Sequence, residues 1–283
     1  MGDREKIGVI GAGLMGAEIA FIFAQAGHPV LLTDRTQETL DAALARLEGI
    51  FDRGIGRGFY RAEDKAALFS HIAATTDRAA FADCDFVTEA VFEREDVKAE
   101  VLRDFDRICK PGCVIASNTS TIPIAALAAH VSEARRPRFI GTHYFSPVSR
   151  MKLVEVIPAF QTAPETIDLA MRLTAGAGKS PIRIKDVAGF AVNRLLHVFM
   201  IEAVRLVEEG VATPQDIDTA CRLGLGHPMG PFELMDATTS SLCLQAQEIM
   251  HDAYGERFRP RPLLKQRVRA GFVGGRGKPG WRS

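Results

Sequence analysis

The chain begins with a strand-like apolar run, KIGVI (residues 6–10), that leads into Gly11-Ala-Gly13-Leu-Met-Gly16 and then into a helical pattern closed by Gly27. A GxGxxG motif between a strand and a helix is typical of a dinucleotide-binding βαβ unit. Gly11 permits the tight turn, Gly13 lets the backbone approach a pyrophosphate, and Gly16 lets helix and strand pack closely. The opening of the sequence therefore predicts a Rossmann-type fold.

The start of the predicted helix and the end of the next strand supply the remaining groups for a dinucleotide. The free N–H groups near Leu14 and Met15 are expected to donate to phosphate oxygens. Asp34 ends the second apolar strand, PVLLTD (29–34). A carboxylate there accepts hydrogen bonds from the adenosine ribose and repels a 2′-phosphate, which predicts NAD rather than NADP. The adjacent Arg35 weakens the prediction of NAD over NADP. An alternative role for Asp34 is to cap the following helix.

The remaining apolar runs define the fold class. Strand-like segments follow at 85–90, 113–117, 138–143, 152–157 and 181–185, with helical segments between several of them. This order predicts a doubly wound, mostly parallel sheet with right-handed crossovers. After Asp186 the apolar residues take helical spacing, beginning at Val192. We therefore expect a Rossmann-type NAD-binding domain over residues 1–187 and a smaller all-α domain over 188–283.

The composition of the chain argues against several kinds of partner and against a metal site. The 35 basic and 35 acidic residues balance, so no global field draws nucleic acid or an anionic membrane to the chain. No apolar run approaches the length of a membrane span, and the first strand begins too early for a targeting peptide. The five cysteines form neither a metal-ligand pattern nor an even disulfide set. These features predict a soluble cytoplasmic protein with no metal site and reduced thiols.

Three polar residues converge at the carboxyl ends of predicted strands, where ligands bind in doubly wound sheets: Glu89, Ser120 and His143. Glu155 lies on a strand whose same-face neighbours are apolar, so its carboxylate needs a partner, and an imidazole is a suitable one. Asn193 poses a similar problem, because its helical stripe is otherwise Leu, Met and Val. The other six histidines are interpreted as structural residues.

Three segments identify a family. GTHYFSPVSRMKLVEV (141–156) resembles the active-site segment of the 3-hydroxyacyl-CoA dehydrogenases, and GFAVNRLL (189–196) with LGLGHPMGPFELMD (223–236) resembles their C-terminal domain. The resemblance covers nearly the whole chain. It implies NAD-dependent oxidation of an (S)-3-hydroxyacyl-CoA to the 3-oxoacyl-CoA and the reverse, as in fatty-acid β-oxidation, on a short acyl chain such as 3-hydroxybutyryl-CoA.

The resemblance also implies roles for individual residues. His143 is the acid/base, and Glu155, twelve residues further on, orients it. A histidine suits this role because its reference pKa of about 6.5 lets it cycle near neutrality. Ser120 and Asn193 place the substrate oxygens, with Ser120 also beside the cofactor. Further residues around NAD are Glu89, Ser146 and Lys278.

The resemblance further implies that coenzyme A contacts a helical arm, where Arg53 and Arg57 form the nearest basic cluster. An ordinary solvated helix end is the alternative for these two arginines, as a solvated tail is for Lys278. Ser146 stands where many family members have Asn. The apolar helical domain, together with the resemblance, predicts a homodimer.

Two other functions remain open from the sequence. One is a dehydrogenase of a 3-hydroxy acid that carries no coenzyme A. The other is a catalytically idle NAD-binding protein, since a fold does not fix a function.

Overall fold

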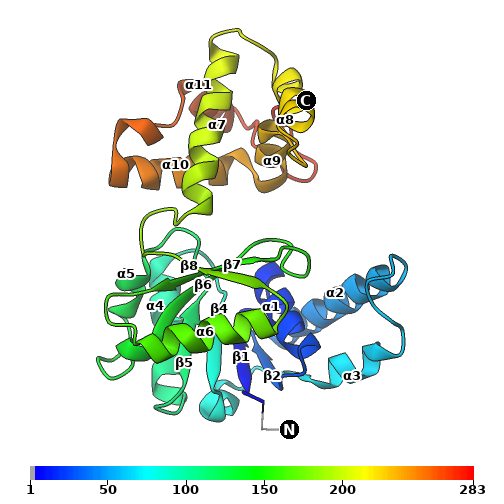
Figure 1. Ribbon diagram of the computed structural model, residues 1–283, viewed down its shortest axis with the longest axis vertical. Coiled ribbons are helices and arrows are strands. Elements are labelled where there is room, and N and C mark those ends of the chain that lie inside the picture. The colour runs from blue at the N-terminus through cyan, green and yellow to red at the C-terminus, as the bar shows by residue number, and fades with distance from the viewer. Residues whose placement is uncertain (1–3) are drawn as a thin grey trace. The chain divides into compact units, whose positions relative to one another are not determined.

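The computed structural model describes residues 4–283 and divides into two compact units, one ending at Asp186 and one running from Val187 to Ser283. The first unit is α/β, and the regular elements of the second are all helices (Figure 1). The predicted fold class is therefore confirmed.

The first unit is built on one eight-stranded sheet with the order β3-β2-β1-β4-β5-β6-β7-β8. The strands are β1 (Ile7–Ile10), β2 (Val30–Thr33), β3 (Ile72–Ala74), β4 (Phe86–Glu89), β5 (Val114–Ser117), β6 (Phe139–Tyr144), β7 (Leu153–Pro158) and β8 (Ser180–Arg183). Neighbours pair in parallel except β6 and β7, which are antiparallel. The order of the first six strands is that of a dinucleotide-binding fold, with its switch point between β1 and β4.

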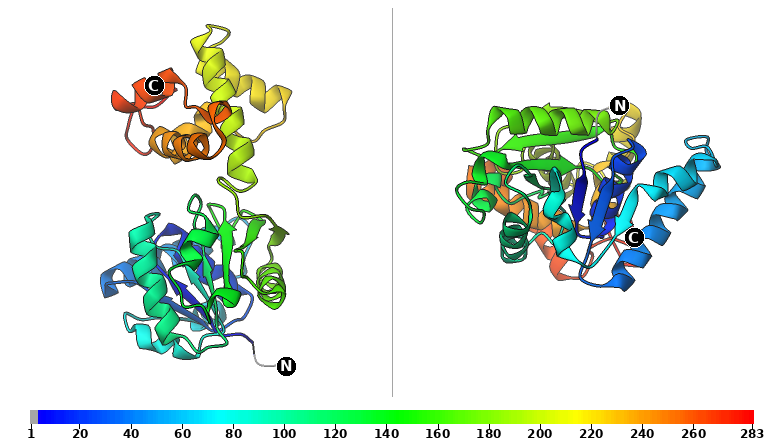
Figure 2. Two further views of the ribbon diagram at one scale, coloured as in Figure 1. Left: turned by 90° about the vertical axis from the view of Figure 1, so that its left-hand side faces the viewer. Right: turned by 90° about the horizontal axis from the view of Figure 1, so that it is seen from below.

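Helices cover both faces of this sheet, as the edge-on view shows (Figure 2). They are α1 (Leu14–Gln25), α2 (Gln37–Ile55), α3 (Asp64–Ser70), α4 (Glu95–Ile108), α5 (Ile124–Ala128) and α6 (Pro164–Gly176), with 3₁₀ turns at Arg78–Asp83 and Arg136–Arg138. The central strands read as continuous apolar runs because both of their faces are buried. Helices α1, α2 and α6 share one core with β1, β2, β6 and β7.

Helix α2 and the residues after it form an arm that extends beyond the sheet (Figure 1). Its sheet-proximal half buries Leu40 and Leu47 in the main core. Near its end the ring of Phe51 stacks on Tyr60, with centroids 4.7 Å apart. The Phe21 ring of α1 lies edge-on to both rings, with centroids 6.5 Å and 5.8 Å away, so these aromatic contacts pack the arm against α1.

The second unit consists of α7 (Val192–Glu208), α8 (Pro214–Gly224), α9 (Pro231–Thr238), α10 (Ser240–Tyr254) and α11 (Pro262–Arg269), with a 3₁₀ turn at Glu256–Phe258. Its core gathers Met200, Val204, Phe232 and Met235 around the long helix α7. Thr213 caps α8 by accepting a hydrogen bond from the Asp216 N–H at 3.2 Å, and Pro214 follows as its first residue. Within residues 4–283, no helix is long and apolar enough to span a bilayer.

Candidate active site

The glycine turn after β1 has the conformation that a dinucleotide needs. Gly11 has φ +97°, a left-handed conformation that a side chain would strain. A Cβ on Gly16 would lie 1.8 Å from the carbonyl oxygen of Gly11, so only glycine allows α1 to pack this close to the strand end. A Cβ on Gly13 would meet no protein atom and would instead fill the open space at the N-terminus of α1. That space is where a pyrophosphate would approach.

A cavity of about 700 Å³ adjoins this turn at the carboxyl ends of β1, β2 and β4. Gly11, Gly13, Leu14 and Met15 line one part of it, and Asp34 lines another. One Asp34 oxygen accepts from the Ala12 N–H at 2.7 Å and the other from the Arg35 N–H at 2.7 Å. Because each carboxylate oxygen has a further lone pair, Asp34 can also accept from ribose hydroxyls. The residues fit a dinucleotide.

Asp34→Ser is expected to narrow the preference for NAD over NADP. The variant removes a charge-assisted acceptor for the ribose, worth about 1.5 kcal/mol or roughly tenfold in kcat/KM with NAD. It also removes the charge that repels a 2′-phosphate. Steady-state rates with both cofactors measure the ratio, and Asp41→Ser, at an exposed acid on α2, should leave it unchanged. Equal wild-type efficiency with the two cofactors would refute the assignment.

His143 and Glu155 are brought together by strand register. They are direct cross-strand partners in the antiparallel pair β6·β7, so their side chains lie on the same face of the sheet. His143 Nδ1 lies 2.8 Å from Glu155 Oε2, and both side chains are buried. A carboxylate only accepts hydrogen bonds, so the imidazole proton is assigned to Nδ1. Nε2 then carries the lone pair of the ring and acts as a hydrogen-bond acceptor.

Ser120 completes a chain of hydrogen bonds with this pair. Its Oγ lies 3.1 Å from His143 Nε2. Asn118, from the same SNTS segment, ties the segment to the histidine strand because its side-chain oxygen accepts from the Tyr144 N–H at 2.9 Å. The loop after β5 and the end of β6 are thus held in a fixed relation.

Glu93 braces the loop that carries Ser120. Its Oε1 accepts from the N–H groups of Ser120 and Thr121, both at 2.8 Å, and from the Thr119 hydroxyl at 2.6 Å. Burial alone would raise the pKa of Glu93, but the Lys98 charge and these hydrogen bonds outweigh it and hold the pKa below its ordinary value. Glu93 is therefore an anion that fixes the backbone at Ser120.

Glu89 lies beneath this loop in a fully buried ion pair. Lys98 Nζ is 2.7 Å from Glu89 Oε1, and the two side chains are 1 % and 0 % exposed. Glu89 also accepts from the Ser117 hydroxyl at 2.6 Å and the Val91 N–H at 2.7 Å. A buried carboxylate with three donors is satisfied by the protein itself. Through these contacts Glu89 ties together the ends of β4 and β5, and its place beside the cofactor stays a prediction.

Lys98→Met is expected to lower the free energy of unfolding by about 3–5 kcal/mol, because it leaves the Glu89 carboxylate buried without a cation. Urea unfolding measures this loss. The double variant Glu89→Gln with Lys98→Met should recover part of the stability, because the charge of Glu89 is then removed as well, while Glu93 still lacks its ion pair with Lys98. A loss below about 1 kcal/mol in the single variant would show that the pair is not needed to keep Glu89 buried.

Comparison with known proteins assigns the family. The model of the 3-hydroxyacyl-CoA dehydrogenase NAD-binding domain matches residues 6–187, and that of the C-terminal domain of the same enzymes matches residues 189–283. The chain belongs to the 3-hydroxyacyl-CoA dehydrogenase family. It is an NAD-dependent oxidoreductase that interconverts 3-hydroxyacyl-CoA and 3-oxoacyl-CoA, as the sequence predicted.

Individual relatives match almost the whole length of the chain. A probable 3-hydroxybutyryl-CoA dehydrogenase from Deinococcus radiodurans is 41 % identical over 95 % of this chain and 96 % of its own. The crystal structure of (S)-3-hydroxybutyryl-CoA dehydrogenase from Ralstonia eutropha superposes with a TM-score of 0.94 at 35 % identity, covering 98 % of each chain. A diketoreductase structure shares 28 % identity with a TM-score of 0.83 over 99 % of both chains.

The remaining predicted site residues are divided between the two units of the dehydrogenase. Ser146 is exposed in the loop after β6, and Arg53 and Arg57 are exposed on the arm. Asn193 is half-buried on the first turn of α7, and Lys278 is exposed near the C-terminus. These last two belong to the second unit, so their roles in the site remain predictions.

Sequence reasoning missed Glu93 and Lys98. Both lie in the run EREDVK (93–98), which reads as the charged start of a solvated helix. Nothing in that run distinguishes Glu93 from Glu95. Only the parallel pairing of β4 with β5 brings the loops after the two strands together and sets Glu93 against Ser120.

Proposed function

We propose that the dehydrogenase acts on short-chain (S)-3-hydroxyacyl-CoA substrates such as (S)-3-hydroxybutyryl-CoA, with His143 as the acid/base. The observation that carries this proposal is the Glu155–His143–Ser120 chain of hydrogen bonds at the carboxyl end of the sheet. The names of the Deinococcus and Ralstonia relatives support the short acyl chain.

In the proposed mechanism, His143 Nε2 takes the hydroxyl proton of the substrate during oxidation and returns it during reduction. Glu155 stabilises the imidazolium that forms and keeps the proton-bearing Nδ1 turned away from the substrate. Ser120 Oγ lies 3.1 Å from Nε2, and the substrate hydroxyl would replace it as the donor to Nε2. The single Ser120 hydroxyl proton would then donate to the substrate oxygen and place it within reach of the histidine. Asn193 supplies a second donor to the substrate. NAD, when bound, accepts or returns the hydride.

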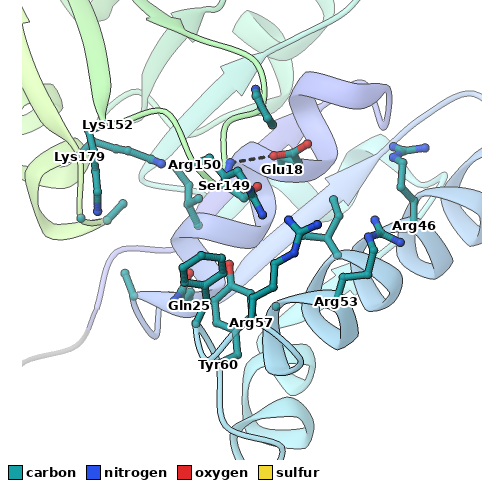
Figure 3. A pocket seen from close by; sticks show the side chains of 18 of the residues that line it. Glu18, Gln25, Arg46, Arg53, Arg57, Tyr60, Ser149, Arg150, Lys152 and Lys179 are labelled. Carbon is teal, nitrogen blue, oxygen red and sulfur yellow. Dashed lines mark hydrogen bonds between the residues drawn. The ribbon is translucent and has the colours of Figure 1, made fainter. Parts of the chain in front are cut away.

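A second cavity in the first unit suits the nucleotide part of coenzyme A. It measures about 1060 Å³ and is bordered by α1, the arm, the loop between β6 and β7, and the turn before β8. Six basic side chains line it: Arg46, Arg53, Arg57, Arg150, Lys152 and Lys179. Arg53 and Arg57 lie on the arm side, and Lys152 and Lys179 lie opposite (Figure 3). Because the chain has no net charge, this local cluster is the natural place for the phosphates.

The proposed substrate is tested by following NADH oxidation with acetoacetyl-CoA, longer 3-oxoacyl-CoAs and free 3-oxo acids. We expect the highest kcat/KM with acetoacetyl-CoA. Arg53→Ser with Arg57→Ser should raise the KM for acetoacetyl-CoA about tenfold, the equivalent of about 1.4 kcal/mol. Arg172→Ser, at an exposed arginine on α6, is the matched control.

The alternative is a substrate without coenzyme A, which the likeness to the diketoreductase supports. Faster turnover of free 3-oxo acids than of every thioester would favour it. No turnover with any of these substrates would instead favour an idle NAD-binding protein.

We also propose that the second unit forms a homodimer. Several large apolar side chains of that unit are exposed, and Leu223 is 83 % exposed. The others are Leu195, Val198, Val211, Leu225, Met229, Leu242 and Phe272. Covering them against a second copy removes apolar surface from water. Light scattering should give a molar mass about twice that of one chain, which is 30.8 kDa. A molar mass of one chain that stays the same when the protein is concentrated would contradict the dimer.

We propose a cytoplasmic location because the cysteines, which all lie within residues 4–283, form no disulfide bonds. All five, at 84, 109, 113, 221 and 243, are free and buried, which is usual in a reducing compartment.

A further inference from the structure

The loop between β6 and β7, residues 145–152, joins the strand of His143 to the strand of Glu155. It also forms one wall of the basic cavity, to which it contributes Arg150 and Lys152. Part of its backbone is bonded within the loop, since the N–H groups of Arg150 and Met151 donate to the Pro147 carbonyl oxygen. Two side chains from other elements bind further backbone groups of the loop.

Glu18 holds the loop from α1. It lies on a helix whose neighbouring residues are apolar, and it is 8 % exposed. Its Oε2 accepts from the Ser149 N–H at 2.7 Å, the contact drawn as a dashed line in Figure 3. Among the cavity-lining residues that the structure describes, Glu18 is the one acid. The negative charge of Glu18 would repel the phosphates of a ligand in this cavity. The hydrogen bond to the loop gives Glu18 a role that does not involve the ligand.

Lys179 holds the same loop from the opposite side. It follows α6 and is buried, and its ammonium group donates to the carbonyl oxygens of Val148 and of Met151, the latter at 3.0 Å. Burial and the nearby Lys152 charge lower the pKa of Lys179 to about 8, while the Glu18 charge opposes this shift. Burying the Lys179 ammonium group costs desolvation free energy, and its two hydrogen bonds to loop carbonyl oxygens offset part of this cost.

We propose that Glu18 and Lys179 are positioning residues that clamp the β6–β7 loop, so that Arg150 and Lys152 are already in place for the nucleotide of coenzyme A. This inference rests on the proposed assignment of the basic cavity to coenzyme A. A preformed wall raises affinity because the loop does not have to be ordered when the ligand binds. The Arg150 guanidinium also lies over the Phe59 ring, 5.5 Å from its centroid, which links the clamped loop to the arm.

The clamp is expected to affect substrate binding and not turnover. His143 and Glu155 are held by the pairing of β6 with β7, independently of the loop contacts. Loss of the clamp should therefore raise KM for a substrate that carries the nucleotide and leave kcat close to its normal value. A thioester of N-acetylcysteamine lacks the nucleotide, so its KM should not change.

The test compares acetoacetyl-CoA with acetoacetyl-N-acetylcysteamine at saturating NADH. We expect Glu18→Ala to raise the KM for acetoacetyl-CoA about tenfold, with kcat within about twofold of wild type. Lys179→Met should raise this KM at least as much, because it also removes a cation that lines the cavity. Glu18→Gln retains an oxygen that accepts from Ser149 N–H and should restore the wild-type KM. Lys265→Met, at a surface lysine on α11, is the control.

An unchanged KM for acetoacetyl-CoA in Lys179→Met and Glu18→Ala would overturn the clamp. So would an equal rise for both thioesters, because that pattern indicates general damage to the site. If Lys179→Met does not fold, the comparison of Glu18→Ala with Glu18→Gln decides the question. Equal wild-type KM values for the two thioesters would show that the nucleotide has no binding site, which defeats the cavity assignment itself.

Discussion

His143→Gln is expected to lower kcat by about 10²- to 10⁴-fold, the usual contribution of a general acid/base. Glutamine fills a similar volume beside Glu155 and Ser120, but its amide cannot take up the hydroxyl proton. The nucleotide turn is formed by separate elements, β1 and α1, so binding of NADH should be unchanged. Steady-state rates with acetoacetyl-CoA and fluorescence titration with NADH measure the two effects.

The matched control for this variant is His130→Gln, because His130 lies on the surface beside Glu95 and Arg103. It should retain wild-type kcat. A His143→Gln enzyme with near-full activity would exclude His143 as the base. Loss of NADH binding together with activity would show that the substitution disturbs the fold.

Glu155→Gln is expected to lower kcat by a comparable factor of about 10²- to 10⁴-fold. The neutral amide cannot stabilise the imidazolium, and its NH₂ group can turn His143 to the tautomer that carries the proton on Nε2. That tautomer has no lone pair to offer the substrate hydroxyl. The measurement is kcat at saturating substrate and cofactor.

Glu165→Gln provides the control, at an exposed acid in the first turn of α6. Retention of more than about a third of the wild-type kcat by Glu155→Gln would show that the carboxylate charge does not assist proton transfer. Circular dichroism establishes that the buried substitution leaves the sheet intact.

The sequence predicted those parts of the fold that depend on local pattern. The glycine turn after β1 and the acid at the end of β2 have fixed spacings, and the structure places them around one cavity. Strand β3, Ile72–Ala74, was missed because three residues are too few to show either alternation or an apolar run. The antiparallel pairing of β7 was not predicted, and that pairing is what sets His143 opposite Glu155.

The supporting residues of the site were harder to predict than its central ones. Glu93 and Lys98 act through contacts between loops that are distant in sequence, which no spacing rule reveals. The place of Glu89 beside the cofactor is implied by the family resemblance and stays a prediction, whereas its buried ion pair with Lys98 is a contact that the sequence pattern does not show. Glu18 lies in an apolar helix, where a sequence pattern cannot show that the Ser149 N–H is its partner.

The central claim is that His143 and Glu155 act as one proton-transfer unit, and the kcat of the double variant His143→Gln with Glu155→Gln tests it most directly. Residues that act as a unit show strongly non-additive effects on kcat. With acetoacetyl-CoA and NADH, the double variant should be no more than a few-fold slower than His143→Gln alone. A kcat reduced by the product of the two single effects would contradict the account, because the carboxylate would then contribute independently of the histidine.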